Sequence, residues 1–218
     1  MFDRIAGRYD ALNRILTFGM DVGWRRKGVR ALALPAGSLV LDLACGTGDL
    51  CRELARAGHR PVGLDFSPAM LARARTRAPL VRADVLRLPV AKGAADGVVC
   101  GFALRNVVDL PGFLREVARV LRPGGRAVFV EVSEPEHPLL RFGHALYFRR
   151  VVPFVGGLLS DREAYAYLPA SMRYLPSPDR LAAMMREAGL EEVRRAALSA
   201  GIAQLIAGTR SRGRGRRT

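Results

Sequence analysis

Two glycines separated by one residue follow a short apolar run in the segment VLDLACGTGDL, residues 40–50. Gly46 and Gly48 allow a sharp turn and let the backbone approach a ligand closely. In an open sheet of alternating strands and helices, ligands bind at such a turn, outside the carboxyl end of a strand. Asp42 and Asp49 flank the turn, disfavour a pyrophosphate and favour a cationic ligand. The dinucleotide fingerprint would also need a third glycine, at a position that holds a cysteine here.

Two further acids follow the next two predicted strands. Asp65 ends the strand RPVGLDF, where an aspartate suits the two hydroxyls of a ribose. Asp84, in RADVLRLP, can accept a hydrogen bond from the amino group of adenine, with the backbone of Val85 beside it. Taken singly, Asp65 is explained as a helix-terminal acid and Asp84 as a solvated loop residue. Acids at three successive strand ends predict a site for S-adenosylmethionine (SAM), which combines adenine, ribose and a positive charge.

The elements that must position these acids alternate along the chain. Apolar residues have helical spacing over 3–17 and 21–33, and a strand then follows each helix up to residue 135. This alternation predicts an α/β fold, with a parallel sheet covered by helices on both faces. An insertion at 137–168 breaks the pattern, before a last helix and two closing strands. We predict strands at 37–44, 60–66, 79–85, 96–104, 126–135, 191–198 and 201–209, and helices at 48–58, 67–78, 110–121 and 177–190.

The bulk properties favour one buried domain. The chain has 218 residues, half of them hydrophobic, and contains neither a long uncharged apolar run nor a signal-peptide pattern. Three cysteines without ligand-like spacing indicate reduced cytosolic thiols and no metal site. We predict a single domain over 1–209, which includes a helical cap at 1–34 and a lid at 137–168. Residues 210–218 are predicted to be a disordered, arginine-rich tail.

The net charge of +15 raises the alternative of a nucleic-acid-binding protein, such as an RNA methyltransferase. The tail RSRGRGRRT supplies five arginines and no acid, and it is the main support for that alternative. Lys27 and Lys92 are the only lysines, so the basic charge is almost entirely arginine. Such a bias is typical of genome composition. We therefore predict no specific nucleic-acid partner.

Several long stretches together resemble the UbiE/MenG family of quinone-biosynthesis C-methyltransferases, over nearly the whole chain. The resemblance implies a class I SAM-dependent methyltransferase with a Rossmann-like sheet of seven strands. Members generally have several residues before MFDRIA, so we expect the start of this chain to be truncated or misassigned. The stretches are FDRIAGRYDALNRILTFGMDVGWRR, LDLACGTGDL, FALRNVVD, VLRPGGRAVFVEVSEP and PFVGGLLSDREAYAYLPASMRYLPSPDRLAAMMREAGL.

The resemblance also implies roles for individual residues. Gly101 stands where some members have serine, and Ala103 stands where glycine is usual. Tyr9 and Asn13 are expected to close the SAM site from the N-terminal helix. The residues expected to bind SAM are Asp42, Gly46, Thr47, Asp65, Asp84, Val85 and Gly101.

Arg105 and Asn106, in FALRN, are the residues that the resemblance places in catalysis. Arginine cannot act as a general base because its pKa exceeds about 12. It can favour a phenolate electrostatically while an ordered water removes the proton, and Asn106 can hold that water or the quinol oxygen. The alternative for Arg105 is a surface pair with Asp109. His137 and His144 are weak candidates for a base, because a lone histidine there is more often structural.

The implied reaction is methylation of a ring carbon on a reduced polyprenyl quinol, most simply demethylmenaquinol to menaquinol. A ubiquinone precursor, 2-methoxy-6-polyprenyl-1,4-benzoquinol, and another small-molecule or lipid acceptor are the alternatives. The insertion offers an apolar surface edged by Arg141, Arg149 and Arg150, suited to a prenyl chain and to anionic headgroups. We expect a cytoplasmic protein, peripheral at the inner face of the membrane, and a homodimer would be compatible with the sequence.

Overall fold

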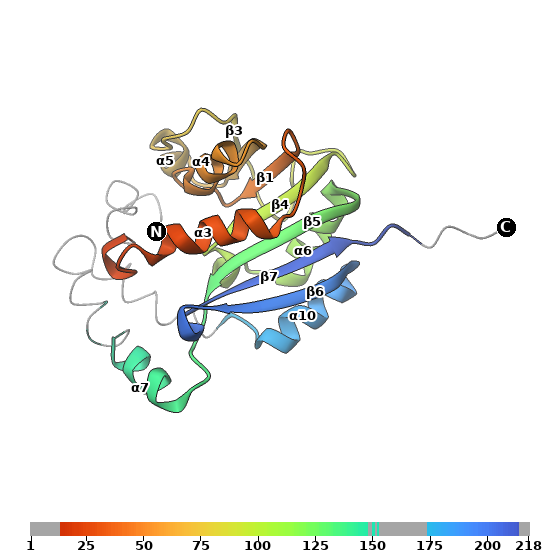
Figure 1. Cartoon of the computed structure of the whole chain (residues 1–218). Helices are drawn as coiled ribbons and strands as arrows, with labels where there is room; N and C mark the ends of the chain where they lie inside the picture. Colours follow the sequence, from red (N-terminus) through yellow and green to blue (C-terminus); the bar gives the residue numbers. More distant parts are fainter. Residues whose placement is uncertain (1–13, 148–149, 151, 153–173, 214–218) are drawn as a thin grey trace.

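The computed structural model describes residues 14–147, 150, 152 and 174–213 (Figure 1). Its centre is a sheet of seven strands in the order β3-β2-β1-β4-β5-β7-β6. The strands are β1 (Leu39–Leu43), β2 (Arg60–Asp65), β3 (Leu80–Arg82), β4 (Ala95–Gly101), β5 (Leu121–Val132), β6 (Leu190–Leu198) and β7 (Ala203–Arg210). The helices are α3 (Met20–Ala31), α4 (Asp49–Arg56), α5 (Pro68–Ala72), η1 (Leu104–Asn106), α6 (Leu110–Val120), α7 (Pro138–Leu146), α10 (Pro178–Glu187) and η4 (Ser199–Gly201).

The first five strands are parallel, as the alternating pattern predicts, but the complete sheet is mixed. β7 runs antiparallel to both β5 and β6. The cause is the short η4 turn between β6 and β7, which reverses the chain without the crossover helix that a parallel strand needs. The predicted parallel sheet is therefore confirmed for the alternating strands, and β7 is the one described strand that runs against the others.

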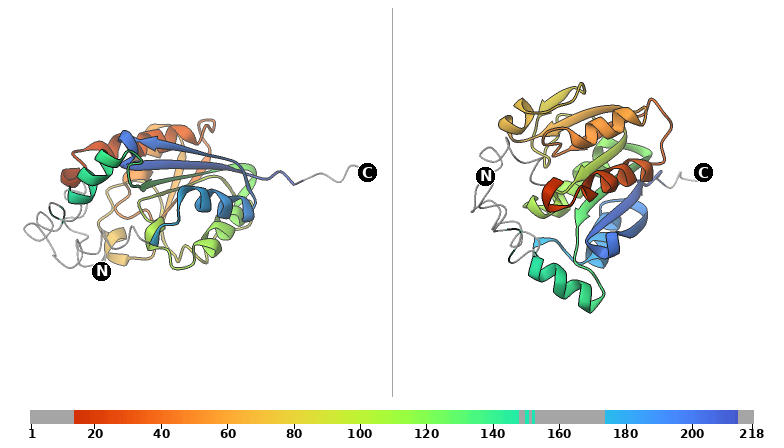
Figure 2. Two further views of the ribbon diagram at one scale, coloured as in Figure 1. Left: turned by 90° about the horizontal axis from the view of Figure 1, so that it is seen from below. Right: turned by 60° about the vertical axis from the view of Figure 1, so that its left-hand side comes forward.

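Helices cover both faces of the sheet (Figure 2), and an apolar core lies on each face. α6 and α10 pack on one face, where Phe113 and Leu181 are fully buried. α3 and α4 pack on the other face, where Trp24 and Leu54 join the second core. This arrangement confirms the predicted layers and leaves the strand ends open to a ligand.

The register brings the predicted site residues together. Leu43 at the end of β1 pairs with Leu64 in β2 and with Cys100 in β4. Because these strands are parallel, the three turns that follow them lie at one edge of the sheet. The residues after β1, β2 and β4 therefore surround a common space.

The helix predicted over 67–78 is shorter in the structure. Ser67 caps it as predicted, because its hydroxyl accepts a hydrogen bond from Met70 N–H at 3.1 Å. The helix ends at Ala72, and the Arg75 N–H donates to the Thr47 carbonyl at 3.0 Å instead of to its own helix. This contact with the glycine turn overrides the helical propensity of the segment.

The predicted lid at 137–168 is described at 137–147, 150 and 152, and most of that stretch is helix α7. Tyr9, Asn13 and Arg149 lie outside the described residues. Among the helices that the structure describes, none combines the length and the apolarity needed to cross a membrane.

Candidate active site

A cavity of about 400 Å³ opens at the carboxyl ends of β1, β2 and β4. Seven of its lining residues are those predicted from the sequence to bind SAM, namely Asp42, Gly46, Thr47, Asp65, Asp84, Val85 and Gly101. Its other walls come from α3, the start of α5 and the segment after β4. The sequence therefore locates this cavity correctly.

The two glycines of the turn have different functions. Gly46 has a φ of +54°, and a Cβ there would meet no atom within 4 Å, so the residue gives the turn its left-handed conformation beside open space. Gly48 has a φ of +81°, and a Cβ there would lie 2.8 Å from the Thr76 methyl group. Gly48 therefore also allows the turn to pack closely against the chain after α5.

Asp42 is the predicted cofactor residue whose carboxylate is both buried and incompletely paired among the described residues. It is 1% exposed, and Oδ2 accepts hydrogen bonds from Cys51 N–H at 3.1 Å and from the Cys51 thiol at 3.2 Å. Oδ1 is buried without a hydrogen-bond partner among the described residues. Burial raises the pKa of Asp42 to about 7. A buried acid with a free oxygen in a cavity wall suits a cationic group.

Cys51 explains why a third glycine is absent from the turn. Its side chain is fully buried against Asp42, and a hydrogen bond with Cys45 together with burial raises the pKa of its thiol. The thiol therefore stays protonated and donates to Asp42. A glycine at this position would lose that donor.

Asp65 and Asp84 are held in place by backbone N–H groups. The Asp65 carboxylate accepts from Gly46 N–H at 2.7 Å and from Ser67 N–H at 2.8 Å, so it ties the end of β2 to the glycine turn. The Asp84 carboxylate accepts from Leu86 N–H at 2.9 Å and is exposed. Each oxygen that accepts one of these bonds can accept another, so both acids remain suitable for ribose and adenine.

Asp49 does not contribute the negative charge that the sequence suggests. Its carboxylate pairs with Arg52, with Arg25 at 3.4 Å and with Arg14 at 3.5 Å. These cations balance its charge, so the idea of an acidic turn with two active acids is wrong for Asp49. Of Asp42 and Asp49, it is Asp42 that has a carboxylate oxygen free to interact with a cation.

Arg25 is a cavity residue that the sequence reasoning missed. It lies on α3, is 8% exposed, and pairs with Asp21 and Asp49 while its guanidinium lies 5.1 Å from the centre of the Phe102 ring. Its buried position follows from the packing of α3 on the sheet. Helical spacing alone could not distinguish it from the exposed arginines around it.

Arg105 and Asn106 occupy the η1 turn just after β4. Asn106 lines the cavity, and its Oδ1 is buried without a partner in the described part of the chain. Arg105 is buried in an ion pair with Glu131 and does not belong to the lining of the cavity. Its Nε has no hydrogen-bond partner among the described residues. The catalytic roles of both residues stay predictions.

The alternative surface pair for Arg105 is wrong. Asp109 instead caps α6, where its carboxylate accepts from Gly112 N–H at 2.8 Å, and its nearest cation is Arg115 at 3.9 Å. His137 is the N-cap residue before α7, His144 lies on α7, and neither lines the cavity. Burial lowers the pKa of His144.

The residues present fit SAM. Asp42 offers an unpaired carboxylate oxygen to a positive charge, and Asp65, Asp84 and Asn106 offer acceptors to hydroxyl and amino groups. Within the residues that the structure describes, no cluster of three or more histidine, cysteine or acidic side chains could hold a metal ion.

Comparison with known proteins points to one family. The model of the ubiE/COQ5 methyltransferase family matches residues 1–210. A demethylmenaquinone methyltransferase from Roseiflexus castenholzii is 44% identical over 95% of this chain and 91% of its own length. A protein of the same name from Thermus thermophilus is 44% identical over 96% of this chain and 100% of its own. A ubiquinone/menaquinone biosynthesis C-methyltransferase UbiE from Syntrophotalea carbinolica is 42% identical over 97% of this chain and 93% of its own.

Solved structures support the same fold. A methyltransferase in complex with the Trm112 activator of Haloferax volcanii superposes with a TM-score of 0.71, at 20% identity over 96% of this chain and 97% of that one. A SAM-dependent methyltransferase from Thermotoga maritima gives a TM-score of 0.69, at 21% identity over 96% of this chain and 98% of that one. The sheet is thus the Rossmann-like fold of class I methyltransferases that the sequence predicts.

The unpaired Asp42 makes a pH-dependent prediction. Because the cationic ligand favours ionised Asp42, SAM affinity should fall by up to about tenfold per pH unit below a pKa of about 7. The substitution D42N should weaken SAM binding at pH 8 and flatten that slope. Calorimetric titration between pH 6 and 8 measures both.

D84N is the matched control, since it removes an exposed carboxylate of the same cavity. It should weaken binding but retain the pH slope of the unmodified protein. Titration of the ligand's own groups is common to all three proteins and cancels in the comparison. An equal slope in D42N and the unmodified protein would contradict the assignment.

Proposed function

The chain belongs to the ubiE/COQ5 methyltransferase family, and we propose that it methylates a ring carbon of demethylmenaquinol to give menaquinol. It is a SAM-dependent C-methyltransferase. The observation that carries the choice of substrate is the name shared by relatives matched over almost their whole length, demethylmenaquinone methyltransferase. A ubiquinone precursor is the second candidate, because another close relative carries both quinones in its name.

The chemistry needs an activated substrate more than an activated donor. Bound SAM supplies a methyl group on a sulfonium, which is already a strong electrophile. A ring carbon of the quinol attacks well only when the neighbouring hydroxyl has lost its proton. The protein therefore has to hold the quinol oxygen, stabilise its negative charge and exclude bulk water.

Asn106 is placed to hold that oxygen or a water beside it. Its side chain lies in the cavity wall just after β4. Its unpaired Oδ1 can accept a hydrogen bond from the quinol hydroxyl or from an ordered water. The same amide can donate from its nitrogen to a phenolate. The amide of Asn106 does not take up a proton near neutral pH, so Asn106 orients the oxygen and does not act as the general base.

Arg105 contributes from behind this wall. Its charge is balanced by Glu131, and its buried Nε–H has no hydrogen-bond partner among the described residues. The pair also fixes the turn, because Glu131 accepts from the Arg105 backbone N–H at 3.5 Å. We propose that Arg105 favours the phenolate through this N–H.

The exposed face of α7 is suited to the apolar part of the substrate and to a membrane surface. Leu139 and Phe142 are 72% and 71% exposed, with Arg141 and Arg150 exposed beside them. A hollow of about 520 Å³ lies between Phe142, Ala145, Leu146 and Arg150. Apolar side chains beside cations are the composition that lies in an anionic interface. We propose that α7 makes transient contact with the membrane.

The direct test of the function is methyl transfer from labelled SAM under anaerobic conditions. Reduced demethylmenaquinone and reduced 2-methoxy-6-polyprenyl-1,4-benzoquinone are offered in parallel. We expect product from the naphthoquinol, and product from both would mean an enzyme that serves both quinones. If SAM binds and neither quinol is methylated, the acceptor lies in another class and the proposal fails.

The role of Arg105 is tested by removing its ion pair as a whole. A single substitution would leave buried Glu131 unpaired and cost about 3–5 kcal/mol, so loss of activity would be ambiguous. The double variant R105Q/E131Q removes both charges and keeps a polar amide at each position. We expect it to fold and to bind SAM within about threefold of the unmodified protein, while kcat falls about a hundredfold or more.

Thermal melting and calorimetry confirm that the double variant is folded and binds SAM. A folded variant with an unchanged kcat would show that the Arg105–Glu131 pair is structural only. The variant N106A provides a second reading, because it should lower kcat without exposing a buried charge.

The membrane contact is tested by co-sedimentation with anionic vesicles at low salt. The unmodified protein should pellet, high salt should release it, and L139S/F142S should pellet much less because α7 loses its apolar face. V108S removes a fully exposed apolar side chain elsewhere and should behave as the unmodified protein. Equal pelleting of both variants would contradict the proposal that α7 makes the membrane contact.

A further inference from the structure

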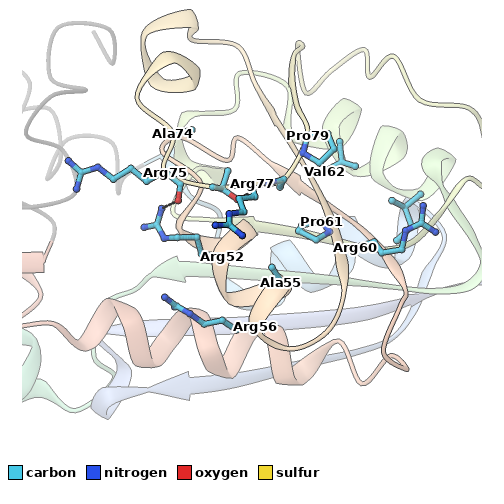
Figure 3. A pocket seen from close by; sticks show the side chains of 13 residues that line it. Arg52, Ala55, Arg56, Arg60, Pro61, Val62, Ala74, Arg75, Arg77 and Pro79 are labelled. Carbon is cyan, nitrogen blue, oxygen red and sulfur yellow. Dashed lines mark hydrogen bonds between the residues drawn. The ribbon is translucent and has the colours of Figure 1, made fainter.

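A second cavity, of about 740 Å³, lies over the starts of β1 and β2 and shares no lining residue with the candidate active site. α4 forms one wall, the segment 74–79 forms the opposite wall, and the starts of β1 and β2 form the floor (Figure 3). The proposed function does not use this cavity.

The chemistry of the lining is one-sided. Five of its thirteen residues are arginines, and no acidic or aromatic residue belongs to it. The floor is apolar, with Leu39, Pro61 and Val62 partly exposed in it. The arginines are Arg52, Arg56, Arg60, Arg75 and Arg77.

Two of the five arginines form an ion pair with a described acid, and Arg60 lies near Asp96, whose pKa is lowered chiefly by its hydrogen bond with Arg122 and also by the charge of Arg60. Arg52 pairs with Asp49, and Arg56 pairs with Glu53. The guanidinium groups of Arg60, Arg75 and Arg77 form no hydrogen bond or ion pair with residues that the structure describes. Three like charges around one hollow repel one another, so an anion there would be favoured by all of them.

The wall that carries Arg75 and Arg77 is held by backbone contacts. Arg52 donates to the Arg75 carbonyl at 2.9 Å, as the dashed line in Figure 3 shows, and the Pro79 carbonyl accepts from Gly63 N–H at 2.9 Å. In Figure 3, Arg52 and Arg77 lie near the middle of the view, and the side chains of Arg75 and Arg60 extend outward in opposite directions. The hollow is therefore part of the fold, and Arg77 is the arginine without an ion pair that lies nearest its middle.

We propose that this cavity binds a small phosphate-bearing amphiphile, with the phosphate on Arg77 in the field of Arg60 and Arg75, and the apolar body on the floor formed by β1 and β2. Guanidinium groups match phosphate oxygens by forked, charge-assisted hydrogen bonds. Leu39 and Val62 remove the adjoining apolar part of the ligand from water.

A nucleic acid fits the lining less well. Proteins that hold a single strand place aromatic side chains under successive bases, and none lines this cavity. A simple inorganic anion would leave the apolar floor unused. The shared chemistry is thus a phosphate head on an apolar body, which either a bilayer phospholipid or a free phosphorylated compound can supply.

The probe is a short-chain, water-soluble phosphatidate, titrated calorimetrically into the full chain. We expect saturable binding with one site, weakened about tenfold or more in R60Q/R77Q because two unpaired guanidinium groups are lost. The control R30Q/R186Q removes two exposed arginines elsewhere and changes the net charge equally. It should bind within about threefold of the unmodified protein.

Vesicles of phosphatidylcholine with and without phosphatidate identify the source of the ligand. If R60Q/R77Q also loses vesicle binding, the site takes a bilayer lipid; if only the soluble probe depends on the two arginines, it takes a free phosphorylated amphiphile. Absence of saturable binding, or an equal loss in R30Q/R186Q, would overturn the proposal. Tighter, arginine-dependent binding of single-stranded RNA would also overturn it, in favour of a nucleic-acid surface.

Discussion

The burial of Asp42 at the end of β1 is the constraint on which the candidate active site depends. The carboxylate sits between the strand and the glycine turn, where burial raises its pKa to about 7. Since an unfolded aspartate has a pKa near 3.8, the folded state holds the proton more tightly, and this acid destabilises the fold as the pH rises from that value to about 7. A cation bound in the cavity offsets that cost. The turn, Cys51 and the start of α4 all serve to hold this acid in place.

Two of the other charges near the cavity are balanced by ion pairs. Asp49 is neutralised by three arginines, and Arg105 by Glu131. Of the cavity acids that form no ion pair with a described residue, Asp42 is the one with a buried, unpaired carboxylate oxygen, where a cationic group fits, beside the neutral acceptor Asn106. We propose that this distribution separates the two tasks of the reaction, with Asp42 selecting the charge of the donor and the residues after β4 binding the oxygen of the acceptor. In contrast, Arg60, Arg75 and Arg77, which form no ion pair with described residues, lie around the second cavity.

Much of this arrangement could be predicted from the sequence, because the signals are local. Period and cap residues give the strands and α4, and an acid at each strand end gives the cavity. The rest depends on contacts between distant segments. Nothing in the sequence near Asp49 reveals that Arg14 and Arg25 neutralise it, and nothing in FALRN reveals its partner Glu131, 26 residues from Arg105. The early end of α5 has the same origin, since Thr47 captures the Arg75 N–H. The antiparallel direction of β7 follows from the short η4 turn before it. The hydrophobic pattern of the sequence does not show the direction in which a strand runs.

The most direct test of this account is to measure the pKa of the Asp42 carboxyl by carbon-13 NMR, without ligand and with SAM bound. The account predicts a value of about 7 in the free protein and a fall to below about 5 when the positive charge is bound. An ordinary aspartate value in the free protein, or no change on binding, would contradict the claim that Asp42 is the unpaired charge around which the site is built.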